Sequence, residues 1–194
     1  MAAAPRLEHM LTLEEFLQRP EIDGSPVQEF IDGRIAYKAI PQLRHALVTI
    51  RMCRAFDAFA EPRGIGESFP ELRCNYLGRS IVPDVVFLLD EHIEYDENDE
   101  LTDRVDYPPD IHVEIVSPGQ SLKVCREKLL HSASHGCSLG LFIDPERKFV
   151  EVYRPGVEVE QLPADGAILG DPVLPGFRLE VSEVFGWLKR RRSS

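Results

Sequence analysis

The chain of 194 residues contains no long apolar run, which limits the classes of protein to which it can belong. No segment approaches the roughly 18 consecutive apolar residues of a membrane-spanning helix. The first residues, MAAAPRLEHMLTLEEFL, contain one early arginine and then acids, without the apolar centre of a signal peptide. The sequence therefore predicts a cytoplasmic protein with no membrane partner.

Closely spaced cysteines are also absent. The four cysteines are widely separated and never occur in Cys-x-x-Cys spacing: Cys53, Cys74, Cys125 and Cys137. This pattern argues against a zinc site built from thiolates and against a disulfide framework. We therefore expect scattered, reduced thiols.

Basic residues are few relative to acids, with 22 Lys and Arg against 33 Asp and Glu and a net charge of −11. A protein that binds phosphates tightly usually carries a basic face, so the overall composition argues against a tight nucleic-acid binder. The acids are concentrated, however, because residues 90–106 hold nine acids and one arginine and so predict an acidic loop. An acidic enzyme can still act on a nucleic acid when a bound divalent metal supplies local positive charge.

The order of periodic segments predicts one mixed α/β or α+β domain over residues 1–194. Helices are expected at 12–19, about 42–60, 119–135 and near the C-terminal end, and strands at 27–37, 67–76, 80–90, 110–117, 138–145 and 148–156. The first strand segment is expected to be a hairpin with a type I′ turn at Asp32-Gly33. The helical spacing in the second helix rests on Leu43, Leu47, Ile50, Arg54 and Ala58. Strand, helix and strand across 110–144 predict a right-handed crossover between two parallel strands.

Acidic side chains fall on two of these strands. Because side chains alternate across a strand, Asp110, His112 and Glu114 share one face. On a central strand such groups are costly unless they are paired, hydrated or bound to metal. Asp84 begins the neighbouring apolar strand, and if the two strands are adjacent, Asp84 and Glu114 can converge on one hard cation. Carboxylates suit Mg²⁺ or Mn²⁺.

A lysine on the following helix completes this candidate site. Lys128 lies about 100° to one side of an apolar helix stripe, so it can reach along the sheet. The stripe consists of Leu122, Cys125, Leu129 and Ala133. An ammonium group there can orient a nucleophilic water or offset transition-state charge. The alternative is that these charges are the solvated rim of an ordinary strand and helix, with His112 the partner of a neighbouring carboxylate.

Several short motifs in fixed order resemble the Uma-two family, whose members are bacterial proteins described as restriction endonucleases of the PD-(D/E)xK nuclease superfamily. The motifs are QEFIDGRIA (28–36), His45, PDVVFL (83–88), PPDIHVEIVSP (108–118), Lys128, Gly136, IDP (143–145) and VEVYRPG (150–156). The resemblance covers about residues 12–188. It implies a restriction-endonuclease-like core with a central mixed sheet flanked by helices, a DNA substrate and a homodimer.

Residue by residue, the resemblance implies Asp84 as the aspartate of the PD motif and Glu114 as the acid of the (D/E)xK motif, together binding Mg²⁺ or Mn²⁺. Lys128 is implied as the catalytic lysine, moved from the strand to the helix. Val116 stands where the superfamily's lysine usually lies, two residues after the acid.

The resemblance also implies supporting residues. Glu29 matches a further acidic position, which can hold a second metal or orient a water. His45 matches the family in the helix after the hairpin. Asp110 matches a position that is often acidic, at the strand edge or behind the site, and His112 belongs with it in a supporting role.

Departures from the family pattern lie beside the site, and they are Gln120 and Val124 in place of acids, Ser132 in place of Tyr and Leu141 in place of Trp. Two functional hypotheses follow. The first is a metal-dependent endonuclease that hydrolyses DNA phosphodiester bonds through Asp84, Glu114 and Lys128. The second is a catalytically inactive scaffold or binding module that keeps the nuclease fold.

Overall fold

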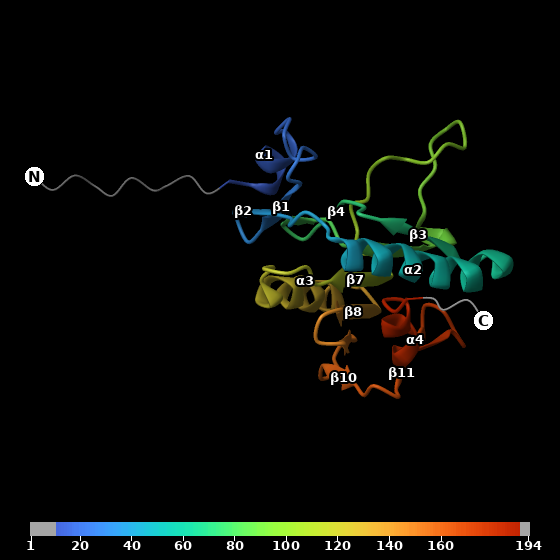
Figure 1. Cartoon of the computed structure of the whole chain (residues 1–194). Coiled ribbons are helices and arrows are strands. Elements are labelled where there is room, and N and C mark those ends of the chain that lie inside the picture. Colours follow the sequence, from blue (N-terminus) through green and yellow to red (C-terminus); the bar gives the residue numbers. More distant parts are fainter. Residues whose placement is uncertain (1–10, 191–194) are drawn as a thin grey trace, which may run out of the picture.

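A mixed six-stranded sheet forms the centre of the structure, a computed structural model that describes residues 11–190 (Figure 1). In spatial order its strands are β10 (Glu160–Leu162), β9 (Phe149–Tyr153), β8 (Leu139–Asp144), β7 (Ile111–Ile115), β6 (Val85–Leu89) and β3 (Gly66–Pro70). β7 and β8 are parallel, and the other neighbouring pairs are antiparallel. The parallel pair is joined by helix α3 (Leu122–Ser134), which confirms the strand–helix–strand connection between parallel strands expected across 110–144.

A smaller sheet lies on the N-terminal side of the molecule (Figure 1). Its strands, in spatial order, are β2 (Arg34–Tyr37), β1 (Gln28–Ile31), β5 (Arg79–Ile81) and β4 (Cys74–Tyr76). β1 and β2 form the predicted hairpin, and its turn residues Asp32 and Gly33 have φ angles of 50° and 77°. Both values lie in the left-handed region that a type I′ turn requires. Towards the C-terminal end, β11 (Ala167–Leu169) pairs with β12 (Arg178–Glu180).

The helices cover the central sheet. α2 (Leu43–Ala60) packs on β3, β6 and β7, whereas α3 packs on β7, β8 and β9. Short helices α1 (Leu13–Leu17) and α4 (Val181–Gly186) lie near the two ends of the described chain, and single 3₁₀ turns occur at Glu61–Arg63 and Asp90–His92. A capping box between Thr12 and Glu15 starts α1, within the helix expected at 12–19. The mixed α+β fold with a central mixed sheet flanked by helices is therefore confirmed.

Alternation along the strands divides the core into two layers. One layer, which includes Val85, Phe87 and Val113, packs against α2 and the C-terminal elements. The opposite face of β6 contributes Val86 and Leu88 to a separate cluster with β4 and β5. Asp84, His112 and Glu114 lie on this second face, between the central sheet, the smaller sheet and α3. The polar face of β7 is therefore enclosed by protein.

The expected apolar stripe of α2 is wrong. Leu43 is 86% exposed and Ile50 is 47% exposed, so neither faces the sheet. The buried positions are His45, Val48, Met52, Cys53, Phe56 and Ala60. The helix is rotated relative to the expected stripe because its apolar face is the one that carries Val48, Met52 and Phe56, which pack in the main core cluster with residues of β6 and β7. This rotation turns His45 inwards.

Two strands expected from the sequence are each divided between the two sheets. The segment 67–76 splits into β3 and β4, with Glu71 at a φ of 52° between them. The segment 80–90 splits into β5 and β6 on either side of Pro83, which has no backbone N–H to continue a ladder. Asp84 thus lies at the point where the chain enters the central sheet.

The acidic segment 90–106 is the loop that its composition predicts. It projects from the body of the molecule, and its middle closes through a bridge between Tyr95 and Leu101 (Figure 1). The four cysteines are free and buried, in agreement with the sequence. Across residues 11–190 the structure has no helix with the length and apolar content to cross a membrane.

Candidate active site

The Asp84 carboxylate lies beside the end of β7 that carries Glu114. The register of β6 and β7 ends at the pair Val85 and Val113, and Asp84 directly precedes it. The Asp84 N–H donates to the Val113 carbonyl at 3.0 Å, and the Ile115 N–H donates to Asp84 Oδ2 at 2.6 Å. These contacts hold the Asp84 carboxylate next to the residue that follows Glu114. Both carboxylates are buried.

Lys128 reaches this pair from α3. Its Nζ lies 2.7 Å from Glu114 Oε1 and 2.7 Å from Glu29 Oε1, and the side chain is 2% exposed. Burial alone would lower the Lys128 pKa, but the Glu114 and Glu29 carboxylates outweigh it and raise the pKa above its ordinary value. Lys128 is therefore a charged ammonium at neutral pH, held in place by carboxylates from a strand of each sheet.

Glu114 is an ionised acid with one free oxygen. Burial would raise its pKa, but the Lys128 ammonium and the hydrogen bond from His112 lower it well below the ordinary value. Oε1 accepts from both Lys128 and His112 Nε2, each at 2.7 Å. Oε2 is buried and has no hydrogen-bond partner among the described residues. A buried carboxylate oxygen without a donor is costly unless something else binds it.

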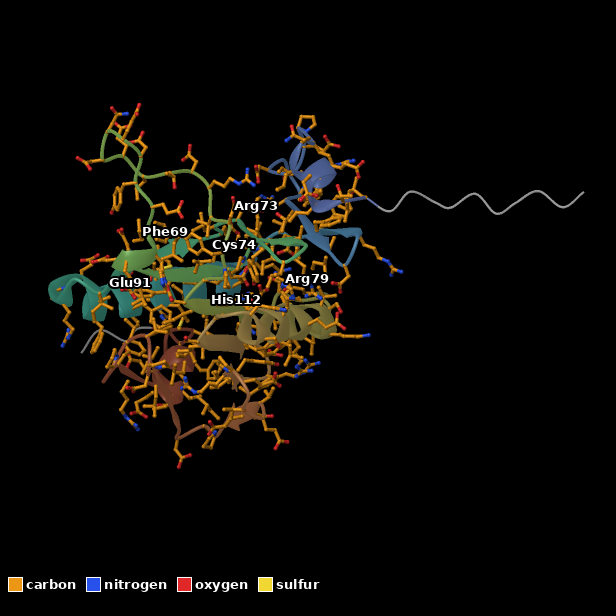
Figure 2. The ribbon with its side chains drawn as sticks, turned by 180° about the vertical axis from the view of Figure 1, so that it is seen from behind. Phe69, Arg73, Cys74, Arg79, Glu91 and His112 are labelled. Atoms are coloured by element: carbon orange, nitrogen blue, oxygen red, sulfur yellow. The ribbon has the colours of Figure 1, made fainter. Side chains whose placement is uncertain are left out.

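His112, Ser132 and Tyr76 form a buried chain of hydrogen bonds behind Glu114. His112 Nδ1 lies 2.6 Å from Ser132 Oγ, which in turn lies 2.6 Å from the Tyr76 hydroxyl. Figure 2 shows His112 on the central sheet beside α3, the helix that carries Ser132. When Nε2 carries an imidazole proton, it donates to Glu114. Ser132 Oγ also donates to the Lys128 carbonyl at 3.1 Å, which ties the chain to α3. The chain therefore fixes the orientation of the Glu114 carboxylate.

Lys38 belongs to this charged cluster, and sequence reasoning missed it. Its Nζ lies 2.7 Å from Asp84 Oδ1 and 2.9 Å from the Val82 carbonyl, and its side chain is 8% exposed. In sequence it is one charge directly after a hairpin, 46 residues from Asp84. The alternation of side chains along the hairpin could have indicated its position. Ala36 pairs with Glu29, and Lys38 lies two residues further along, so Lys38 is expected on the same face of the sheet as Glu29.

Glu29 and His45, both expected to support the site, do border it. Glu29 Oε1 accepts from the Val82 N–H at 2.7 Å as well as from Lys128. His45 Nε2 lies 3.3 Å from Asp84 Oδ2 without forming a hydrogen bond to any described residue. Burial lowers the pKa of His45, although the Asp84 carboxylate acts in the opposite direction. Its imidazole is therefore neutral near pH 7.

Asp110 lies outside this cluster. Its Oδ2 accepts from the Leu89 N–H at 2.8 Å and lies 2.9 Å from His92 Nδ1. These contacts are at the start of β7, whereas Glu114 is near its end. Alternation predicted the correct face for Asp110 but not its distance from Asp84.

A cavity of about 240 Å³ opens onto the cluster between the β1–β2 hairpin and the start of α3. Its charged lining residues are Glu29, Lys38 and Lys128. Gln120 and Val124, two of the departures from the family pattern, line the same cavity. The altered positions therefore lie at the entrance to the site, and the cavity gives a ligand access to Lys128.

The carboxylate pair fits a hard divalent cation. Among residues 11–190 there is no ready group of three His, Cys, Asp or Glu side chains that would hold a metal ion. Mg²⁺ usually takes only one or two protein carboxylates and completes its shell with waters and substrate phosphate. Asp84 and Glu114 supply that number, and the unpartnered Oε2 of Glu114 is an oxygen of the required kind.

Comparison with known proteins identifies a family and solved structures that this chain resembles. A family model named Uma2, described as "Putative restriction endonuclease", matches residues 13–182. A crystal structure described as "a putative nuclease belonging to DUF820", from Anabaena variabilis ATCC 29413, is 33% identical, with a TM-score of 0.88, and the match covers 92% of this chain and 99% of that one. No curated protein matches.

Proposed function

The chain belongs to the Uma2 family, and from this premise we propose that it is a metal-dependent endonuclease that hydrolyses DNA phosphodiester bonds. The observation that carries the proposal is the cluster of two buried carboxylates, Asp84 and Glu114, with the Lys128 ammonium 2.7 Å from Glu114. The arrangement supports a PD-(D/E)xK site in which the lysine comes from a helix. The proposed partner is DNA, and the proposed assembly is a homodimer.

Asp84 and Glu114 would hold Mg²⁺ or Mn²⁺, which supplies a Lewis acid for the phosphate and lowers the pKa of a bound water. The low pKa of Glu114 keeps it ionised over the whole physiological range. His112 restrains rotation of this carboxylate, because its Nε2 lies 2.7 Å from Oε1. Oε2 is left as the ligand atom.

Lys128 would orient the attacking water or a phosphate oxygen. An ammonium group has three N–H donors, and Glu114 and Glu29 accept two of them. The third donor remains for a ligand in the cavity that Lys128 lines. Glu29 acts as a positioning residue, because its contacts with Lys128 and with the Val82 N–H tie the lysine to the chain just before Asp84.

The acidic composition does not oppose this proposal. The segment 90–106 leaves β6 after Leu89, at the end of the strand opposite Asp84. The five residues of β6 lie between Asp84 and Asp90, so six steps of roughly 3.3 Å place the start of the acidic segment about 20 Å from Asp84. Screening over that distance leaves little of its repulsion at the site at physiological salt.

The second candidate is a non-catalytic module with a structural charge cluster. The observation in its favour is that Lys38 and Lys128 already pair with Asp84, Glu29 and Glu114, so the buried carboxylates have counterions without a metal. The two candidates differ in their response to metal. Mn²⁺ that binds only the folded nuclease raises its melting temperature, whereas a structural cluster gives no shift.

Plasmid nicking tests the proposal directly. We expect the wild type to nick supercoiled DNA with Mg²⁺ or Mn²⁺ and not with EDTA. Glu114→Gln and Lys128→Met should each lose about 100-fold or more of this activity, the usual cost of losing a group that stabilises transition-state charge. Glu151→Gln is the matched control, since Glu151 is a buried carboxylate of the same sheet that pairs with Arg126 outside the cluster. Nicking that persists in both site variants would contradict the assignment.

A further inference from the structure

The Lys38 ammonium occupies a position suited to a cation. Three oxygen atoms surround Nζ: Asp84 Oδ1 at 2.7 Å, the Val82 carbonyl at 2.9 Å and Glu71 Oε1 at 4.0 Å. Carboxylate and carbonyl oxygens are also the ligands that hard divalent cations take in proteins. The ammonium group therefore sits among ligands that a metal ion would use.

A metal ion that binds Asp84 would compete with Lys38 for one carboxylate oxygen, Oδ1, because Oδ2 already has other partners. Oδ2 accepts from the Ile115 N–H at 2.6 Å and has His45 Nε2 beside it at 3.3 Å. Oδ1 is held by Lys38. The Lys38 ammonium and a divalent metal ion cannot both bind this oxygen, because two positive charges so close together repel each other strongly in a buried site.

The side chain of Lys38 can leave Asp84 while its backbone stays in place. The Lys38 N–H donates to the Val27 carbonyl at 2.9 Å, which fixes the chain just after β2. The side chain lies between two cavities, one of about 240 Å³ beside Lys128 and one of about 370 Å³ beside Arg73. A lysine is a point charge on a flexible stem, so it can turn into either space without moving the sheet.

We propose that Lys38 is an internal competitor of the divalent cation: it holds Asp84 Oδ1 in the metal-free protein and leaves this oxygen when the metal binds. The inference rests on the proposed function, since it requires metal binding at Asp84. Binding of the metal and the Lys38–Asp84 contact are then linked, and each weakens the other by the same factor. Lys38 sets the metal affinity without being one of the ligands.

Calorimetric titration of the full chain with Mn²⁺ tests the competition. Lys38→Met should bind Mn²⁺ about tenfold or more tightly than the wild type, within the usual range of coupling between two sites. Lys38→Gln, which keeps a hydrogen-bond donor but not the charge, should shift the affinity in the same direction. Lys123→Met is the control, because Lys123 is an exposed lysine on α3 that pairs with Glu127, and it should match the wild type.

Thermal unfolding of the same proteins gives a second readout. Without metal, Lys38→Met should melt below the wild type, since Asp84 loses its counterion, and saturating Mn²⁺ should raise its melting temperature by more. Equal or weaker Mn²⁺ affinity in both Lys38 variants would overturn the inference and leave the proposed function intact. If the wild type fails to bind Mn²⁺, or Asp84→Asn binds it equally well, the proposed metal site itself is wrong.

Discussion

Replacing Lys128 by methionine should destabilise the protein more than any other single change in the cluster. The substitution keeps an unbranched side chain one heavy atom shorter and leaves Glu114 and Glu29 without their shared ammonium. At 2.7 Å and an effective dielectric constant of about 20, each ion pair is worth about 6 kcal/mol before desolvation is subtracted. Breaking a buried ion pair costs about 3–5 kcal/mol in practice, and we expect a loss in that range at pH 7.

The loss should depend on pH in a defined direction. In the wild type the lowered pKa of Glu114 stabilises the fold above the ordinary carboxyl pKa of about 4.3, and this contribution fades as the pH falls towards the lowered value. The raised pKa of Lys128 contributes stability at every pH below about 10. In Lys128→Met the ammonium no longer offsets the effect of burial, so the pKa of Glu114 is higher than in the wild type. Glu114 therefore takes up a proton at a higher pH in the variant. The difference between the two proteins should therefore shrink from pH 7 to pH 4.5.

Urea unfolding at the two pH values measures this difference. Lys123→Met is the control, because an exposed lysine pair contributes at most about 1 kcal/mol. Adding Glu114→Gln to Lys128→Met should recover part of the loss, since the double variant no longer buries an unpaired Glu114 charge. A loss below about 1 kcal/mol at pH 7, or a difference that grows on acidification, would refute the charge states assigned to the cluster.

Three further predictions follow from neighbouring contacts. Ser132→Ala should cost about 1–3 kcal/mol in urea unfolding, because it leaves His112 Nδ1 and the Tyr76 hydroxyl without their buried partner; an unchanged stability would remove the role of this chain. Asp110→Asn should leave the Mn²⁺ affinity at the wild-type value in calorimetry, and a large loss would place Asp110 at the metal. Burial raises the pKa of the Cys53 thiol to about 11 and the pKa values of the Cys74 and Cys137 thiols to about 12. A thiol reagent at pH 8 should therefore label these three cysteines only after the protein unfolds. Rapid labelling of the native protein would contradict their burial.

The central part of the candidate site was predictable because its geometry depends on short-range rules. Alternation placed His112 and Glu114 on one face, and the motif order placed Asp84 on the adjacent strand. The position of Lys128 beside an apolar helix stripe predicted that it reaches along the sheet, and the structure brings it to Glu114. Each of these predictions follows from the repeat of side-chain direction, every two residues along a strand and every 3.6 residues along a helix, and this repeat is visible in a single sequence.

Long-range contacts were not predictable in the same way. Lys38 reaches Asp84 only because the hairpin folds against the point where the chain passes from β5 to β6. Tyr76 meets Ser132 across 56 residues, and nothing local distinguishes either from an ordinary core or surface position. Asp110 shows the converse limit, since a strand pattern gives the face of a side chain but not which end of the strand meets the neighbouring acid.

The break of the expected strand 80–90 illustrates how one residue changes the topology. A continuous apolar run predicted one strand, but Pro83 divides it between two sheets. The same break brings Val82 beside both Glu29 and Lys38, which is how the smaller sheet takes part in the site. Local propensity could not assign the two halves to different sheets, because that depends on packing partners distant in the sequence.

A crystal of the protein soaked in Mn²⁺ tests the central claim most directly, with anomalous scattering used to locate the metal. The proposed function predicts an anomalous peak bonded to Asp84 Oδ1 and Glu114 Oε2, with Lys38 turned away from Asp84. Density without a metal peak between these two carboxylates, and with Lys38 still bound to Asp84 at saturating Mn²⁺, would contradict it.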